Sequence, residues 1–141
     1  MRSLRGVLVV IVLLLACAGG WWMLRDAPVE EYPITNLQPQ GTKLIVLGDS
    51  LTSGVGASSG QGYVDELSRR LGVPILNRGR AGDTTSDALQ RLRPDVLSQN
   101  PRVVVVLLGG NDILRKVPVE QTFANLRTII QKTQEIGRAH V

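Results

Sequence analysis

The feature that most constrains the fold is a regular alternation of strand and helix patterns from Lys43 onward. The clearest strand lies within Arg102–Leu108, which holds six consecutive apolar residues, four of them valine. Such a run suits a central parallel strand that is buried on both faces. Lys43–Leu47 and Val73–Asn77 are shorter strand candidates. The alternation predicts a layered α/β domain built around a parallel sheet.

Three helices are expected to cover this sheet. The first runs from Tyr63 to Leu71 and ends at Gly72, and the second spans 84–92 before Pro94 breaks it. The third runs from Val119 to about Glu135. Apolar residues recur at helical spacing and predict these helices, and the apolar stripe of the first can cover the sheet. The apolar residues are Tyr63, Val64, Leu67 and Leu71, then Ala88, Leu89 and Leu92, and finally Val119, Phe123, Leu126 and Ile130.

Residues 1–25 have the pattern of a membrane anchor or signal segment. Arg2 and Arg5 precede an uncharged stretch from Gly6 to Leu24, which is close to the roughly 20 residues that a membrane-spanning helix needs. The arginines favour a cytoplasmic N-terminus. The rest of the chain is therefore expected outside the cytoplasm, in the periplasm or cell envelope.

The segment Leu14–Cys17 also resembles a bacterial lipobox, in which the cysteine is lipidated after cleavage. An uncleaved inner-membrane anchor, a lipoprotein and an ordinary cleaved signal all remain open, and all three give the same compartment. Residues 26–41 carry three prolines without periodicity, so they are interpreted as a linker. The folded domain is then expected over 42–135.

Charge argues against a nucleic-acid partner. The net charge of +4 comes from 16 Lys and Arg against 12 Asp and Glu, and the basic residues are scattered. The pairs Arg69/Arg70, Arg91/Arg93 and Arg115/Lys116 are interpreted as solvated helix and loop faces. Aromatic residues are too few to form a base-stacking platform.

Glycine-containing turns follow all three predicted strands, at 48–52, 79–84 and 109–112. Because the strands are parallel, the turns share the carboxyl edge of the sheet, where open α/β sheets bind ligands. If the first strand is central, in a flavodoxin-like 2-1-3 order, Ser50 stands between the other two turns. A serine hydroxyl can attack a carbonyl while preorganised donors stabilise the developing oxyanion. The amides of Ser50 and Gly82 and the side-chain carboxamide of Asn111 would be those donors.

These turns resemble the sequence blocks of the GDSL/SGNH hydrolases. Gly48-Asp49-Ser50-Leu51-Thr52 is similar to block I, Gly82 to the block II glycine, and Gly109-Gly110-Asn111-Asp112 to block III. Their order and spacing are most similar to the branch of bacterial thioesterases, lysophospholipases and arylesterases, over about residues 43–135.

The resemblance implies a three-layer α/β/α fold with Ser50 as nucleophile and Gly82 and Asn111 as further oxyanion donors. Asp49 and Asp112 are expected to brace their loops through backbone hydrogen bonds. The implied substrates are small-molecule or lipid carboxylic esters and thioesters, and no metal or organic cofactor is implied.

A nucleotide-binding module is the main rival from another class, because glycine-rich turns also cradle phosphates. The turn at Gly54-Val55-Gly56 lacks the lysine of a P-loop, and Gly60 falls one residue too late for the dinucleotide fingerprint. Neither signature is met.

The base that a serine nucleophile requires has no good candidate. The only histidine is His140, and Gly137 stands where the family's Asp-x-x-His pattern has aspartate. Residues 136–141 match one reading frame of a common sequencing adapter, so they are predicted to be a non-native tail on a domain that is incomplete at its C-terminus. The chain itself is expected to hydrolyse esters poorly, and the alternative function is a non-catalytic, membrane-tethered binding domain.

Overall fold

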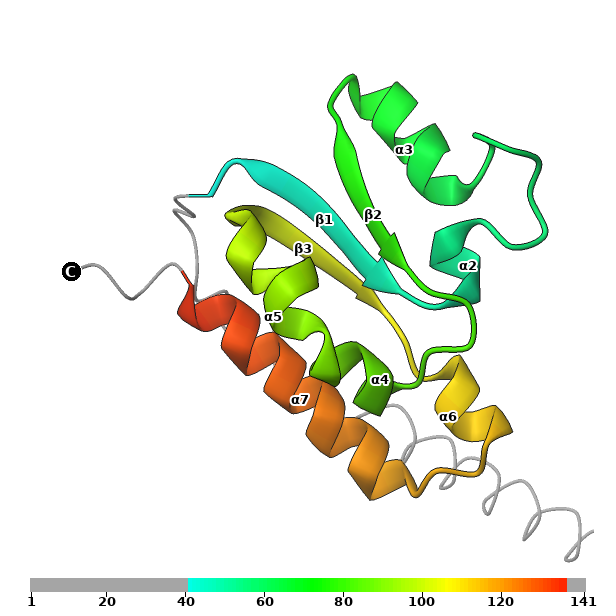
Figure 1. The fold of residues 1–141 in the computed structure, drawn as a ribbon, viewed down its shortest axis with the longest axis vertical. Helices are drawn as coiled ribbons and strands as arrows, with labels where there is room; N and C mark the ends of the chain where they lie inside the picture. The colour runs from blue at the N-terminus through cyan, green and yellow to red at the C-terminus, as the bar shows by residue number, and fades with distance from the viewer. Residues whose placement is uncertain (1–40, 137–141) are drawn as a thin grey trace, which may run out of the picture. The chain divides into compact units, whose positions relative to one another are not determined.

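The computed structural model describes residues 41–136, which lie within the compact unit Thr35–Val141 (Figure 1). The predicted leader, most of the linker and all but the first residue of the predicted tail lie outside the described residues. The sheet has three strands in the order β2-β1-β3, and both pairings are parallel. These strands are β1 (Lys43–Gly48), β2 (Ile75–Gly79) and β3 (Pro101–Leu107). The predicted parallel sheet and its 2-1-3 order are confirmed.

Helices follow each strand. They are α2 (Ser50–Ser53), α3 (Tyr63–Leu71), α4 (Thr85–Gln90), α5 (Leu92–Asp95), the 3-10 turn η1 (Leu97–Gln99), α6 (Gly110–Leu114) and α7 (Val119–Glu135). The bounds predicted for α3 and α7 are confirmed. Gly72 ends α3 with a left-handed φ of 65°, a conformation that glycine adopts without steric cost.

The main core lies between the sheet and α4, α5 and α7, which Figure 1 shows together on one side of the sheet. Its buried residues are Ile45, Leu47, Ala88, Leu92, Val96 and Ile129. Side chains alternate along a strand, so the buried Val46 of β1 faces the other side. On that side Asn77 of β2 donates to the Thr52 carbonyl of α2 at 2.7 Å. Helices therefore cover both faces, as the three-layer prediction requires.

Strand β3 corrects one expectation, because it is not buried on both faces. Val104 and Val106 pack against the main core. Val103 and Val105 face the other way and are 43% and 44% exposed. The physical reason is positional: within residues 41–136, β3 is an edge strand, and no described helix packs on its second face.

The second predicted helix is also corrected. It is divided at Arg91 into α4 and α5, and Pro94 lies inside α5 instead of breaking a helix before it. Pro94 is tolerated there because the first turn of a helix has backbone N–H groups without intrahelical partners, so its missing N–H costs no hydrogen bond. Strand β2 begins at Ile75, two residues later than predicted.

Helix α7 is rotated relative to its predicted apolar stripe. Val119, Phe123 and Ile130 are exposed, whereas Asn125 and Ile129 are buried. The apolar spacing therefore predicts this helix but does not identify its buried side. Asn125 takes part in a buried polar network described below, and that network fixes the rotation of the helix.

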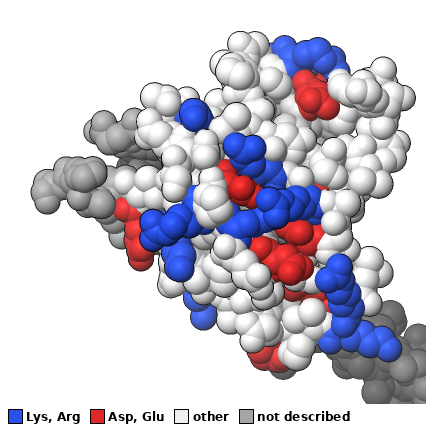
Figure 2. Space-filling model, viewed as in Figure 1, with Lys and Arg blue, Asp and Glu red and all other residues white. Residues whose placement is uncertain are grey.

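Charged side chains of both signs are interspersed over the face shown in Figure 2, with no single basic patch. Among residues 41–136, no helix has both the length and the apolar character needed to cross a bilayer.

Candidate active site

The three glycine-containing loops meet at the carboxyl edge of the sheet through contacts between each pair. Arg80 N donates to Gly48 O at 3.0 Å, which joins the second loop to the first. Asn111 Nδ2 donates to Asp83 O at 2.8 Å, which joins the third to the second. A Cβ built on Gly110 would lie 3.7 Å from an Asp49 carboxylate oxygen, so the first and third loops are also neighbours. The topology thus brings the predicted site loops together.

Ser50 is the first residue of α2 and is half-buried. Asp49 caps this helix, because its Oδ1 accepts a hydrogen bond from Leu51 N at 3.1 Å. The turn packs directly on the end of β2, since a Cβ on Gly79 would lie only 2.2 Å from Ser53 N. Backbone at Ser50 is therefore fixed by its own cap and by close packing against the neighbouring strand.

Gly82 has a left-handed φ of 85°, which disfavours any residue with a side chain. Its carbonyl accepts a hydrogen bond from Arg115 Nη2 at 2.7 Å. A Cβ at this position would lie 3.4 Å from the same nitrogen. The positive φ, more than crowding, is the local reason for glycine here.

Asn111 lies in α6, and its carboxamide is oriented by the bond to Asp83 O. A carboxamide nitrogen carries two N–H donors, and this bond uses one of them. The second N–H can serve a ligand. Asp83, the residue that follows Gly82, therefore also holds the Asn111 side chain in place.

Asp112 is 1% exposed and sits at the centre of a buried polar network. It accepts hydrogen bonds from Thr85 N at 2.9 Å, Thr85 Oγ1 at 2.6 Å and Thr122 Oγ1 at 3.3 Å. Asn125 Nδ2 donates to Thr85 Oγ1 at 3.0 Å. The carboxylate therefore ties α6 to the start of α4 and to α7. Its one backbone partner among the described residues is Thr85 N, so the predicted brace within its own loop is replaced by a brace to the neighbouring helices. Thr85, Thr122 and Asn125 were not predicted from sequence, because single polar residues within helices carry no distinguishing pattern.

Arg91 corrects the interpretation of Arg91/Arg93 as a solvated pair, because its side chain is only 7% exposed. Its guanidinium binds Asp83 and Asp95 and two strand-end carbonyls. The one available sequence signal was Asp95, four residues later and within reach on the same helical face.

One carboxyl group near the site has a shifted pKa. The Thr84 N–H and hydroxyl both donate to the Asp87 carboxylate, and these bonds hold the pKa of Asp87 below its ordinary value of 3.8. The nearby positive charges of Arg115 and Arg91 act in the same direction. Asp87 is thus an ionised partner in the capping box that begins α4.

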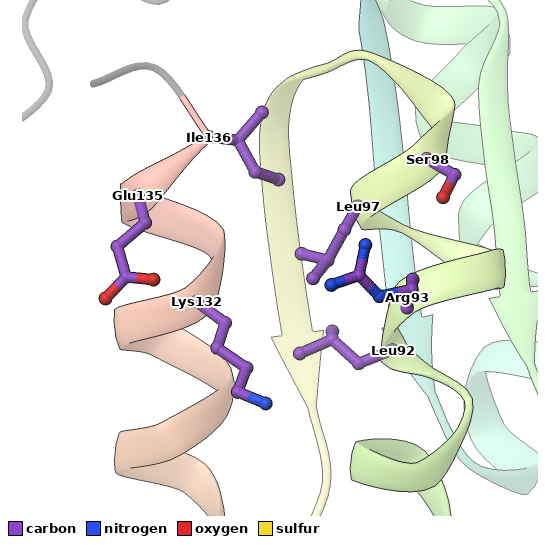
Figure 3. A pocket seen from close by; sticks show the side chains of 7 residues that line it. All are labelled: Leu92, Arg93, Leu97, Ser98, Lys132, Glu135 and Ile136. Carbon is purple, nitrogen blue, oxygen red and sulfur yellow. The ribbon is translucent and has the colours of Figure 1, made fainter. Parts of the chain in front are cut away.

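A separate hollow of about 590 Å³ lies between α5, η1 and the end of α7 (Figure 3). Leu92, Leu97 and Ile136 line it together with the charged Lys132 and Glu135. It contains none of the predicted site residues, so it is not part of the candidate active site.

The candidate site holds no histidine among residues 41–136, because His140 is the only histidine of the chain. Within the same range, no group of three or more metal-ligating side chains is arranged to hold an ion. What the described residues offer is a serine at the start of α2 and, on the loops that meet there, the Gly82 amide and the Asn111 carboxamide.

Comparisons with known proteins agree with this geometry. Residues 46–141 match the model of the GDSL-like lipase/acylhydrolase family. Esterase TesA of Pseudomonas aeruginosa is 34% identical over 105 residues, covering 71% of this chain and 52% of that protein. Thioesterase 1/protease 1/lysophospholipase L1 of Escherichia coli strain K12 is 40% identical over 91 residues, covering 62% of this chain and 43% of that protein.

Among solved structures, the SGNH-hydrolase family esterase AlinE4 superposes with a TM-score of 0.60 at 36% identity. The superposition covers 67% of this chain and 55% of that structure. The fold neighbours thus carry the SGNH-hydrolase fold that the sequence resemblance implies. The chain spans about half the length of the relatives that it matches.

Proposed function

The chain belongs to the GDSL-like lipase/acylhydrolase family, and from this premise we propose that the protein is a serine hydrolase of carboxylic esters or thioesters. The observation that carries the proposal is the meeting of three loops at one sheet edge, with Ser50 at the start of α2 and the Asn111 carboxamide tied to Asp83 O. Acyl transfer requires this combination of a nucleophile and oxyanion donors.

In the proposed mechanism, Ser50 Oγ attacks the ester carbonyl carbon, and the carbonyl oxygen takes up negative charge. The N–H groups of Ser50 and Gly82 and the free N–H of Asn111 stabilise that charge. Collapse of the intermediate expels the alcohol or thiol, which takes up the proton removed from Ser50, and leaves an acyl-serine. Water then attacks the acyl group, releases the carboxylic acid and leaves a proton on Ser50 Oγ.

A base must remove the Ser50 proton for efficient turnover. The family pattern supplies it as the histidine of Asp-x-x-His, and this pattern has no match in the 141 residues. We therefore expect turnover from a protein that carries such a pair, and poor ester hydrolysis by this chain alone.

We propose small-molecule or lipid esters as substrates. The names of the relatives, an esterase and a thioesterase/lysophospholipase, support this class. We also propose that the site lies outside the cytoplasm, in the periplasm or cell envelope, with attachment to the membrane, and the sequence pattern of residues 1–25 supports this.

The proposal is tested by hydrolysis of p-nitrophenyl butyrate by the protein translated from the complete reading frame that contains this chain. Ser50→Ala should lower kcat by at least about 10³-fold, because it removes the nucleophile. Ser58→Ala removes an exposed hydroxyl from the loop after α2 and should leave kcat unchanged. Equal activity of the wild type and Ser50→Ala would remove Ser50 from the nucleophile role, and no hydrolysis by the wild type would instead favour the non-catalytic, membrane-tethered binding domain.

A further inference from the structure

A buried guanidinium lies directly beneath the candidate site. Arg91, between α4 and α5, makes four hydrogen bonds at 2.6–3.1 Å. Nε donates to Asp83 Oδ2 at 2.6 Å, Nη1 to Asp95 Oδ2 at 2.8 Å and to Arg78 O at 3.0 Å, and Nη2 to Gly48 O at 3.1 Å. One side chain therefore joins the ends of β1 and β2 to the loop that carries Gly82.

Stability alone is a weak explanation for this arrangement. Taking a charged group out of water is costly, and well-packed apolar replacements of buried ion pairs are often as stable or more stable. A planar guanidinium, however, offers donors in fixed directions. It can hold two carbonyls and two carboxylates in one geometry, which an apolar side chain cannot do.

Asp83 connects this guanidinium to the predicted oxyanion donors. Its carboxylate binds Arg91, its N–H donates to Arg80 O at 3.2 Å, and its carbonyl accepts the Asn111 carboxamide at 2.8 Å. Gly82 immediately precedes it in the chain. A shift of Asp83 would therefore move the Gly82 backbone and the Asn111 side chain together.

We propose that Arg91 is a positioning residue that acts through Asp83 to aim the Gly82 N–H and the Asn111 carboxamide at the carbonyl oxygen of the substrate. The inference rests on the proposed function, because that function makes these two groups oxyanion donors. Arg91 does not itself touch the substrate. Its bond to Gly48 O, two residues before Ser50, also fixes the loop that carries Ser50 relative to the loop that carries Gly82.

Asp95 offers a matched control, because it is the second carboxylate on the same guanidinium. Asp83 and Asp95 have similarly small side-chain exposures of 13% and 19%, and each lies within 2.8 Å of an Arg91 nitrogen. Asp95, however, belongs to α5, and its carboxylate contacts the loop that carries Gly82 only through a longer ion pair, 3.7 Å, to the exposed Arg80 side chain. If Arg91 only secures α4 and α5 against the sheet, loss of either carboxylate should have the same consequences.

The first readout uses the 141-residue chain in detergent micelles and requires no activity. In ¹⁵N relaxation measurements, Asp83→Ala should lower the order parameter of the Gly82 amide from about 0.85 to below about 0.6. The Asn111 carboxamide resonances should move toward those of a free side chain. Asp95→Ala should leave both signals in place while lowering Tm by a comparable amount, and the Val46 amide reports that the sheet stays folded.

Arg91→Lys supplies a second variant in case Asp83→Ala fails to fold. An ammonium group is a single point donor, so it cannot hold four acceptors in these directions. The lysine variant should keep the sheet signals and lose order at Gly82 and Asn111. Unchanged Gly82 and Asn111 signals in Arg91→Lys, or identical changes in Asp83→Ala and Asp95→Ala, would show that Arg91 is only a structural residue.

The second readout is the kcat of the protein expressed from its complete reading frame. Asp83→Ala should lower kcat on the order of 10²-fold with KM nearly constant, because small misplacements of oxyanion donors are costly in the transition state. Asp95→Ala should change kcat little. An inactive wild type would count against the hydrolase function. The relaxation data test the positioning role of Arg91 without requiring activity.

Discussion

Replacement of Asp112 by alanine is expected to destabilise the domain more than replacement of the exposed Asp65, which accepts a hydrogen bond at the start of α3. Asp112 is 1% exposed and accepts three hydrogen bonds, two from Thr85 and one from Thr122. Alanine leaves the buried Thr85 N–H without a partner, which costs about 1–3 kcal/mol, and removes the acceptor of the Thr85 hydroxyl, which costs about 1 kcal/mol more. Relief of the desolvation of the carboxylate offsets part of this cost.

The net loss is therefore about 2–4 kcal/mol in the free energy of unfolding. For a domain of this size, about 3 kcal/mol corresponds to a decrease in Tm on the order of 10–25 °C. Asp112→Asn should lose roughly half as much, because one carboxamide oxygen can still accept the Thr85 N–H. Thermal unfolding followed by circular dichroism measures both variants.

Asp65→Ala is the matched control, because Asp65 is the exposed carboxylate that accepts the Gly62 N–H at 3.2 Å at the start of α3. Its loss should cost about 1 kcal/mol, the usual value for a helix cap. If Asp112→Ala shifts Tm no more than Asp65→Ala, the buried network does not hold α4, α6 and α7 together, and the reasoning given for the rotation of α7 is wrong.

Three further predictions concern the site and its supports. Asn111→Ala should lower the kcat of the protein expressed from its complete reading frame on the order of 10² to 10³-fold, and a loss under about threefold would remove Asn111 from the oxyanion role. The folded pKa of Asp87 lies below 3.8, so this carboxylate should stabilise the domain at higher pH and lose that contribution as pH falls through and below 3.8. The unfolding curves of wild type and Asp87→Asn should therefore differ at about pH 6 and converge in acid. A difference in stability that widens in acid would contradict the assigned direction. Gly79→Ala should prevent stable folding, because its Cβ would lie 2.2 Å from Ser53 N and 2.5 Å from Thr52 C, both backbone atoms. A Tm equal to that of the wild type by calorimetry would contradict this packing.

Sequence patterns predicted the parts of the fold that depend on local chemistry and on strand order. The bounds of α3 follow from an apolar stripe and a glycine stop, and the position of Ser50 between two other loops follows from a parallel 2-1-3 sheet. Both depend on rules that act within one segment or at one sheet edge.

Several misses depend on contacts between distant segments. The buried side of α7 includes Asn125, which binds Thr85 at a separation of 40 residues, so hydrophobic periodicity alone does not identify that side. Arg91 was taken for a surface residue because its partners, Asp83 and the strand-end carbonyls, become neighbours only in the folded chain. Burial of β3 was overestimated because a valine run does not specify which strands will flank it.

The most direct measurement is a crystal structure of the protein phosphonylated at Ser50. The phosphoryl oxygen imitates the oxyanion of the tetrahedral intermediate. It should lie about 2.7–3.1 Å from the amide nitrogens of Ser50 and Gly82 and from Asn111 Nδ2. A phosphoryl oxygen that points to solvent, with Gly82 N and Asn111 Nδ2 beyond hydrogen-bond distance, would contradict the hydrolase assignment.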